Sequence, residues 1–376
     1  MLFRSILMTE SLLTQSPQLA VKLHNVIYAP PGKDFDQWKN KDISFTLSRG
    51  SQSLRVKQKV FRMSDRKFMP TNVGQTEEFV VHACDETLLK DAAKLVSKSW
   101  KCTKPSDIVD HVLEKCVGVQ GDKKQVDTAD PKRDFIAENL HPYQIIAQQS
   151  NVALAEGSDP SFLHFMTYEN EGKHYFTSLK KMAQDKSFKT YQQVDIENET
   201  GYKNDSYAVN FSFPCDFDYL SDVLNGIDEQ GKDQNSGSFI NPVNKSFSGF
   251  FGGGGDSECG SLGKYNYKEA ISNKSTSEQQ NSCNLDVENH LLKRQARMGL
   301  LDRDKIALRI TVPCNLELHV GKIITLKWDN LKAASGTTVY GDGDYLIASM
   351  THNIKLGGFS VTTMDCVAKS AGQGVV

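Results

Sequence analysis

The C-terminal part of the chain, residues 305–371, alternates apolar and polar side chains with a period of two. Its clearest stretch places apolar residues at every second position and other residues between them: Ile306, Leu308, Ile310 and Val312 against Ala307, Arg309 and Thr311. A half-buried antiparallel strand requires this period, because successive side chains point to opposite faces of a sheet. Turn-forming Pro and Gly residues divide the region, which predicts strands over residues 305–312, 316–328, 345–354 and 359–367.

The remainder of the chain predicts further strands and a block of helices. Period-two stretches near the N-terminus predict strands over residues 19–23, 43–47, 54–63 and 78–83. Helical spacing then predicts helices over residues 88–96, 106–118 (from a Ser106 cap to Gly118) and 142–157, with an exposed loop over 120–133. The order ends with a hairpin over 162–176, a strand over 209–213, a Gly- and Ser-rich stretch over 226–284 and a helix over 285–301.

Bulk composition limits the classes of function. The chain has 376 residues, enough for several domains of about 100–200 residues each. Its net charge is −2, from 44 Lys and Arg against 46 Asp and Glu, so it lacks the basic excess of a dedicated nucleic-acid binder. No apolar run approaches the roughly 18 residues of a membrane helix, so we expect no stable membrane binding. Its eight cysteines include no C-x-x-C pair, which favours mostly reduced, structural thiols in a cytosolic setting.

Two motifs invite a catalytic or nucleotide-binding interpretation. The run FFGGGGD at residues 250–256 is rich in glycine, but a phosphate-binding loop needs a preceding strand and a following Lys-Ser/Thr. A flexible loop is therefore the better interpretation. Ser360, His352 and Asp365 could form a nucleophilic triad, but they lie on predicted strands and no strained turn presents the serine. A chance set of polar strand residues explains them better.

Charged clusters give no stronger signal. Glu169 with Glu171, and Asp216 with Asp218, could suggest a glycosidase, but such neighbours are expected among 46 acidic residues. The basic stretch HLLKRQAR at residues 290–297 is better explained as a solvated helix face than as a nucleic-acid site. The nine histidines are dispersed without metal-ligand spacing. We therefore predict no catalytic, cofactor-binding or metal-binding residue, no cofactor, and a structural or binding role rather than an enzyme.

The second half of the chain resembles a known family in the order of its motifs. A helix over residues 287–297 leads into the strand ALRITV (307–312), followed by PCNLELHVGKIITL (313–326), YLIASMTH (345–352) and FSVTTM (359–364). This order is similar to that of the central baseplate hub protein of T4-like contractile phage tails, and to the related hubs of type VI secretion spikes. Upstream, residues 91–100, 106–118 and 143–175 resemble the family's helical domain.

The resemblance implies an α+β fold that is mainly β, with two tube-type antiparallel β-barrels, an α-rich intervening domain and an irregular insertion in the second barrel. The implied division is a first barrel over residues 1–100, an α/β domain over 101–200, a split second barrel over 201–230 and 305–370, and an insertion over 231–304. Three chains would form a pseudo-sixfold ring that adapts the hexameric tail tube to a trimeric central spike and leaves a channel for DNA.

The same resemblance implies the partners and the location. The partners would be two further copies of the chain, the central spike protein, the tail tube or tube-initiator protein and other baseplate proteins, with DNA only in transit. The chain would lie in the tail baseplate of the virion after assembly in the host cytoplasm. Two alternatives stay open: a hub with peptidoglycan-hydrolase activity, or a carbohydrate-binding β module. The second would need an aromatic platform, and Trp38, Trp100 and Trp328 are far apart in sequence.

Overall fold

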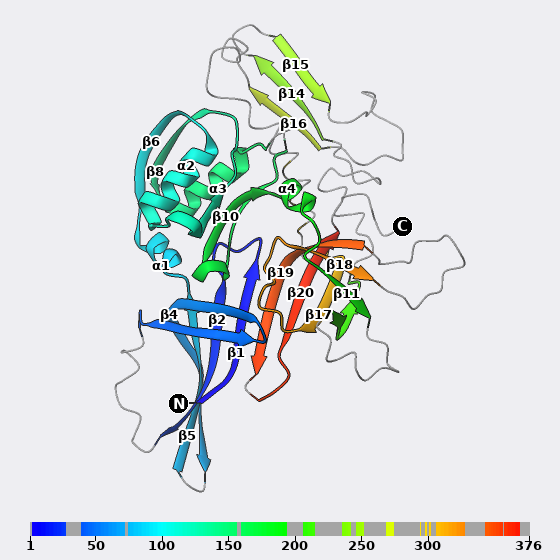
Figure 1. Ribbon diagram of the computed structural model, residues 1–376. Helices are drawn as coiled ribbons and strands as arrows, with labels where there is room; N and C mark the ends of the chain where they lie inside the picture. Colours follow the sequence, from blue (N-terminus) through cyan, green and yellow to red (C-terminus); the bar gives the residue numbers. More distant parts are fainter. Residues whose placement is uncertain are drawn as a thin grey trace, which may run out of the picture.

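The computed structural model describes most of the chain. The described residues are 2–27, 39–71, 74–155, 159–193, 206–214, 235–241, 246–251, 268–273, 294, 298, 301, 306–327, 343–355 and 357–368. These residues form mainly strands, with a few short helices grouped at one end of the sheets (Figure 1). The expected mainly-β α+β class is confirmed. The predicted helix over 285–301, the glycine run at 252–255, Asp216 and Asp218, Trp38 and Trp328 lie almost entirely outside the described residues.

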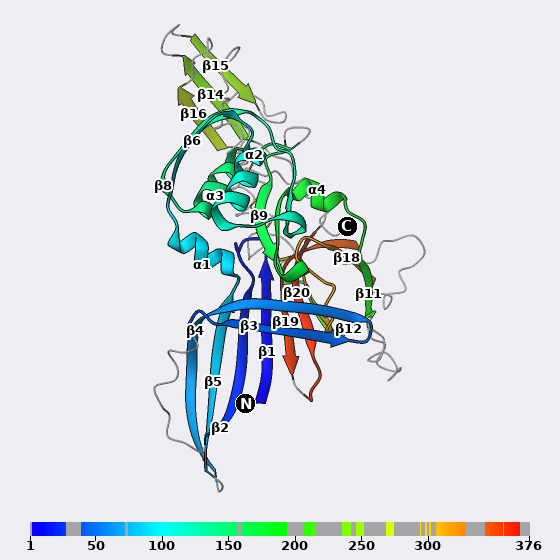
Figure 2. The same ribbon diagram turned by 60° about the vertical axis from the view of Figure 1, so that its left-hand side comes forward.

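The N-terminal part forms an antiparallel sheet in the order β1-β2-β5-β4-β3. Its strands are β1 (Leu2–Ser11), β2 (Gln18–Ile27), β3 (Asp42–Arg49), β4 (Gln52–Thr71) and β5 (Gly74–Cys84). The long strand β4 pairs with β3 in its first half and with β5 in its second, with register shifts between Val60 and Arg62 and between Ser64 and Lys67. These irregularities let β4 turn a corner, so the β3–β4 hairpin crosses over the other strands (Figure 2).

The helical region follows and carries its own core. Its elements are α1 (Glu86–Ala93), β6 (Val96–Thr103), α2 (Pro105–His111) with a π-helical turn (Val112–Val117), β7 (Lys124–Val126), β8 (Arg133–Leu140), α3 (Pro142–Val152), β9 (Phe162–Thr167), β10 (Lys173–Ser178) and α4 (Leu179–Gln184). The predicted hairpin is confirmed by the antiparallel pairing of β9 with β10. The apolar spacing of α2 buries Ile108, Val109 and Leu113 against Tyr143 and Ile146 of α3.

Three details of this region differ from the predictions. The helix expected over 88–96 ends at Ala93, because Val96 already belongs to the buried side of β6. Helix α2 begins with Pro105 at its first position after Lys104, so Ser106 is inside the helix and does not cap it. The loop expected to be exposed over 120–133 contains β7 and the fully buried Ala129.

The C-terminal strands form a second sheet around another core. They are β11 (Lys189–Gln193), β12 (Tyr207–Ala208), β13 (Asn210–Ser212), β17 (Leu308–Pro313), β18 (Ile323–Lys327), β19 (Gly343–Lys355) and β20 (Val361–Ala368). Three of the four predicted terminal strands are confirmed as β17, β19 and β20. The strand predicted over 316–328 is wrong in its first half: residues 314–322 form an irregular buried segment, and only Ile323–Lys327 is a strand.

A separate small sheet lies within the region expected to be an irregular insertion. It consists of β14 (Asn235–Asn241), β15 (Ser246–Phe251) and β16 (Lys268–Asn273), in the order β15-β14-β16. Figure 1 shows it beyond the helical region, at the end of the molecule opposite the tip of β5. Residues 231–304 therefore contain regular structure that the composition did not predict.

Strand β19 joins the N-terminal and C-terminal sheets into one. Along one edge it pairs with β20, and along the other it pairs first with β18 (Ile323↔Leu346) and then with β1 (Ser11↔Ser349 to Ser5↔Lys355). One continuous antiparallel run therefore passes through β4, β5, β2, β1, β19, β20, β17 and β13. Figure 1 shows β1 and β19 side by side at the centre of the molecule. This continuity places the site described below.

Gly321 tests how tightly the second sheet meets the helical region. Its φ of +85° favours glycine, and a Cβ atom there would lie 3.0 Å from Met182 Sδ and 3.3 Å from Phe165 Cζ. Gly321→Ala should therefore lower the free energy of unfolding by about 1–3 kcal/mol in urea denaturation. Gly50→Ala is the matched control, since its φ is +58° but nothing lies within 4 Å of its added Cβ. Equal costs for the two variants would show that the close approach at Gly321 has no energetic consequence.

Candidate functional site

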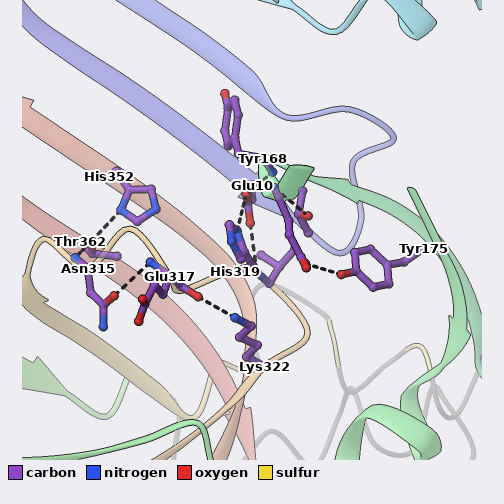
Figure 3. A network of polar contacts seen from close by, with 12 residues as sticks. Glu10, Tyr168, Tyr175, Asn315, Glu317, His319, Lys322, His352 and Thr362 are labelled. Atoms are coloured by element: carbon purple, nitrogen blue, oxygen red, sulfur yellow. Dashed lines mark hydrogen bonds and ion pairs between the residues drawn. The ribbon is translucent and has the colours of Figure 1, made fainter. Parts of the chain in front are cut away.

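The irregular segment over residues 314–322, here called the junction segment, lies where the two sheets meet. Most of its side chains are buried, and Glu317 is exposed. It follows β17 and precedes β18. Its polar groups contact Glu10 of β1, Gln52 of the β3–β4 turn and Thr362 of β20, and Figure 3 shows the contacts to Glu10 and Thr362. An irregular backbone cannot satisfy its own N–H groups through a strand ladder, so each must find another partner. These partners define the site.

Glu10 is the central residue of the site. It is only 1% exposed, and its carboxylate accepts hydrogen bonds from the backbone N–H of Tyr168 (2.7 Å) and of Val320 (3.1 Å). His319 Nδ1 lies 3.1 Å from the same carboxylate. Figure 3 shows these groups converging on Glu10 from the junction segment and from the end of β9. One side chain of β1 thus connects the first sheet, the helical region and the second sheet.

The electrostatics of Glu10 favour its charged form. Burial by itself raises the pKa of a carboxyl group, but the electrostatic interaction and hydrogen bond with His319 and the Tyr168 N–H outweigh that effect. The pKa of Glu10 consequently lies below its ordinary value. A buried carboxylate with this set of partners is a structural anchor, because its oxygens accept hydrogen bonds from groups on both sides of the junction.

A second set of contacts attaches the β3–β4 turn to the junction segment. Gln52 Nε2 donates to Asn315 Oδ1 (2.9 Å), and Gln52 Oε1 accepts from the backbone N–H of Leu316 (3.1 Å). Arg49 donates to the carbonyl of Cys314. The Asn315 N–H in turn donates to Thr362 Oγ1 (3.3 Å). The amide of Gln52 therefore fixes the turn of the first sheet against the second through both of its polar ends.

Besides His319 of the junction segment, the described histidines include His174 and His352, which are buried, and His164, which is partly buried. His164 and His174 lie in the β9–β10 hairpin with parallel stacked rings, and Nε2 of His164 is 3.2 Å from Nδ1 of His174. His352 bonds Thr362 Oγ1 through Nδ1 at 2.7 Å, beside the junction segment. Burial lowers the pKa of His164 and of His352 to about 4. Burial, with the neighbouring His164, lowers the pKa of His174 well below its ordinary value. All three are therefore neutral at pH 7.

The proposed nucleophilic triad does not exist in the structure, in agreement with the sequence argument. His352 is directed to Thr362 on the core side of the sheet. Asp365 receives a hydrogen bond from Arg309 Nε at 2.6 Å and another from Ser349. Ser360 accepts from the backbone N–H of Lys355. Each residue serves the packing of its own strand.

The remaining predicted candidates also have structural contacts. Glu169 accepts a hydrogen bond from the hydroxyl of Tyr175, and Glu171 forms an ion pair with Arg55 at 3.0 Å. Trp100 is buried in the core of the helical region and offers no exposed platform. Of the basic helix over 290–297 only Arg294 is described, and it donates to the carbonyl oxygens of Pro160 and Phe162.

Several expected absences can be examined only for the part of the chain that the structure describes. Within that part, no three His, Cys, Asp or Glu side chains gather as a metal site would require. No helix built from the described residues is long and apolar enough to cross a membrane. Among the described cysteines, Cys84, Cys116, Cys314 and Cys366 form no disulfide, as expected, whereas Cys102 is disulfide-bonded. The expectation of reduced thiols is therefore wrong at Cys102.

Neither Glu10 nor His319 is among the residues predicted from the sequence. A signal for Glu10 exists, because Met8, Glu10 and Leu12 occupy alternate positions and so share the inward face of β1. A glutamate at such a position must have a buried partner. No comparable signal identifies His319, because the junction segment is irregular and its partner is more than three hundred positions away in the chain.

Comparison with known proteins connects this architecture to phage tails. No family model matches the chain. Over 139 residues the chain is 31% identical to the protein named "Probable baseplate hub protein gp334" of Vibrio phage KVP40. That stretch covers 37% of this chain and 32% of the phage protein, so the match spans about a third of the relative.

Solved structures share the fold over nearly the whole chain. The 43 kDa tail protein of prophage MuSo2 from Shewanella oneidensis is 12% identical with a TM-score of 0.55, covering 99% of this chain and 96% of its own. A tail protein from Neisseria meningitidis MC58 is 9% identical with a TM-score of 0.56, covering 98% and 93%. The E. coli c3393 protein, a component of the type VI secretion system, is 9% identical with a TM-score of 0.50, covering 98% and 74%.

These two kinds of likeness agree with the motif order found in the sequence. The fold is that of phage tail proteins and of a type VI secretion component, and the matched stretch is that of a baseplate hub protein. The expected resemblance to tail hub proteins is therefore confirmed. The names of these proteins are those of a baseplate hub protein and of a phage tail protein.

Replacing Glu10 tests the anchor. Glu10→Gln keeps the shape of the side chain but replaces one carboxylate oxygen by an amide N–H₂ group. Either the Tyr168 N–H or the Val320 N–H then loses its acceptor. We expect the free energy of unfolding in urea to fall by about 2–3 kcal/mol. Glu138→Gln is the matched control, since Glu138 is exposed on β8, and it should change stability by less than about 0.5 kcal/mol. If both variants unfold at the same urea concentration, Glu10 is not an anchor.

The buried histidines predict a loss of stability in acid. Between about pH 6.5 and pH 4 the unfolded chain takes up protons that the folded histidines do not, so the free energy of unfolding falls as pH falls. His164 and His352 each contribute up to about 3 kcal/mol to this loss. The lowered pKa of Glu10 acts in the same sense, because its folded carboxyl also binds fewer protons than the unfolded one, and it adds to the loss of stability only below about pH 4.5.

The measurement is the slope of unfolding free energy against pH between pH 7.5 and pH 4.5. His164→Gln should flatten this slope, because one buried imidazole no longer titrates. Phe165→Leu, a buried neighbour without a titratable group, should lower stability at every pH without changing the slope. A wild-type slope of zero over this range would contradict the assignment of neutral buried histidines.

Proposed function

We propose that the chain is the structural hub of a contractile phage tail baseplate. Three copies form a pseudo-sixfold ring that adapts the hexameric tail tube to the trimeric central spike and leaves a channel for DNA. The observation that carries this proposal is the continuous sheet that runs from β4 to β13 through both halves of the chain. Fold likeness to phage tail proteins and the partial match to a baseplate hub protein support it.

The two ends of this sheet offer a route to ring closure. Among the described strands, β3 pairs only with β4, and β13 pairs only with β17. An unpaired strand edge is a liability that a folded protein must cover. Because the two edges are on different strands, joining β13 of one copy to β3 of the next is a head-to-tail contact, which produces a closed ring when the rotation fits. Three such contacts would close a ring through these two edges.

The strand order also supports six similar sectors in three chains. In each chain β1, β2, β5 and β4 form one antiparallel group, and β19, β20, β17 and β13 form another, joined by the β1–β19 pair. We propose that these groups belong to two tube-type barrels, the first over residues 1–100 and the second over 201–230 and 305–370. Residues 101–200 form the intervening α/β domain and 231–304 the insertion of the second barrel.

The partners follow from this role. The ring would bind the central spike on one side and the tail tube or tube-initiator protein on the other, with further baseplate proteins around it. DNA would pass through the channel during ejection. The chain would assemble in the host cytoplasm and remain in the baseplate of the virion. The likeness to a type VI secretion component is consistent with the same adaptor geometry in a related machine.

Light scattering on the purified chain, alone and with its spike protein, tests the ring. We expect three times the mass of one chain, and a variant that blocks the β3 edge should remove it. Arg49 and Gln52 flank a two-residue loop and form a hydrogen-bonded pair. Hydrogen-bonded and non-hydrogen-bonded pairs alternate along an antiparallel hairpin, so Thr46, three residues before Arg49, has its N–H directed away from β4. Thr46→Pro deletes this donor at an edge where the isolated chain tolerates proline. It should give a folded monomer.

Thr46→Val is the matched control, because it keeps the backbone N–H and should still form the trimer. Circular dichroism checks that both variants keep their strands. A stable dimer that ignores the spike would contradict the proposed ring, and a trimer that survives Thr46→Pro would show that closure does not use this edge of β3.

A further inference from the structure

The outward face of the continuous sheet carries a row of hydroxyl and amide side chains. The register of the strands places six such residues side by side across β2, β1, β19, β20, β17 and β13: Gln18, Thr9, Thr351, Thr363, Thr311 and Asn210. Thr9 and Thr351 have their hydroxyl oxygens 3.5 Å apart, and those of Thr311 and Thr363 are 3.1 Å apart. We call this surface the threonine face. It spans both halves of the chain without interruption.

The threonine face has almost no free charge. Its neighbouring outward positions are small or neutral, such as Ala20, Ser11, Ser349, Asn353 and Val361. Arg309 and Asp365 face each other across β17 and β20, and Arg309 Nε donates to Asp365 at 2.6 Å. Lys22 and Lys355 lie beyond the row, toward one end of the strands. Exposed sheet surfaces usually carry many charged side chains, so this depletion needs a physical reason.

The composition of the threonine face does not suit a protein–protein interface. The core of such an interface is built from aromatic or large aliphatic anchors that fill pockets on the partner. Leu7, 42% exposed, is the large apolar side chain that the described part of this face presents. The four threonines of the row are half-buried and keep contact with water. A neutral, hydroxylated and flat surface of this kind binds other proteins weakly.

The opposite face of the same sheet is occupied. Met8, Val21 and Val81 pack in the core of the first sheet, and Ile310 and Met364 pack in the core of the second. Only the threonine face can therefore form an open wall when the sheet closes on itself. Because it is continuous from β2 to β13, three copies joined through their sheet ends would present it as one uninterrupted surface, on either the inside or the outside of the ring.

We infer, on the basis of the proposed ring, that the threonine face lines its axial channel and is the surface that DNA passes. A wall with fixed lysines would hold the phosphates of DNA, because each contact releases a condensed counterion. A wall of acids would repel the duplex. Neutral hydroxyls keep the wall hydrated and leave few fixed charges to bind the phosphates, and the single ion pair of Arg309 and Asp365 is already closed. The chemistry of the face fits a conduit for a polyanion.

Cysteine accessibility in the assembled full-length protein tests this inference. Thr363→Cys and Thr311→Cys place a thiol on the threonine face, and Ile136→Cys places one on the outer strand β8, where Ile136 is 65% exposed. Among the described cysteines, Cys84, Cys314 and Cys366 are buried and Cys116 is partly so, and the labelling of the unmutated chain is measured first and subtracted as background. Light scattering first establishes whether each variant forms the ring.

In a ring, the thiols at positions 363 and 311 should react with a small maleimide but lose most of their reaction with a large polymer-linked maleimide, because the channel excludes it. The thiol at position 136 should react with both reagents. If the thiols at positions 363 and 311 react with both reagents, as the thiol at position 136 does, the threonine face lies on the outside of the ring. Thiols that react with neither would show a protein-covered face. Either result overturns the inference while leaving the ring intact, whereas a failure to form any ring overturns the proposed function and the inference with it.

Discussion

The pairing of β1 with β19 is the contact on which the rest of the structure depends. It brings together the two ends of the chain, from Ser5 with Lys355 to Ser11 with Ser349, and continues in the hydrogen bond from the Leu12 N–H to the Ala348 carbonyl. Without it the molecule would be two separate sheets, each with an additional open edge. Closing a loop of this length costs little more than closing a shorter one, because the entropy rises only with the logarithm of length. The long separation of β1 and β19 in the chain therefore lowers the free energy of unfolding only slightly, but it slows folding.

Glu10 explains how this pairing keeps its register. Met8 belongs to the core of the first sheet and Leu12 to the core of the second, and Glu10 lies between them on the same face of β1. A slip of one residue would turn all three side chains to the other face and place Thr9 in their position. The slipped carboxylate would lose the N–H groups of Tyr168 and Val320, which would then be buried without an acceptor. The contacts of Glu10 at the junction thus favour the observed register of β1 against β19 over a shifted one.

The sequence predicts most strands and helices correctly, but not how they meet. Alternation is a local property, so β17, β19 and β20 could be predicted from their own residues, as could the β9–β10 hairpin. Residues 316–322 show why this method fails at the junction: their apolar side chains are buried, as in a strand, but a φ of +85° at Gly321 and contacts to β1 and the β3–β4 turn hold them irregular. Those contacts come from residues hundreds of positions away. The Glu10–His319 contact has the same origin, and no spacing marks it in the sequence.

Because side chains alternate between the two faces of a strand, the central strands β1 and β19 have a different role on each face. Along β1 the inward residues Met8, Glu10 and Leu12 fix the register, and the outward residues Thr9 and Ser11 belong to the threonine face. Along β19 the inward His352 contacts Thr362 near the junction, and the outward Thr351 lies beside Thr9. In the proposed ring, a wall for DNA would need a rigid position and a surface that binds phosphates weakly. An alternating strand can supply both, because the buried donors and the carboxylate that fix the register lie on one face and the hydroxyl groups on the other.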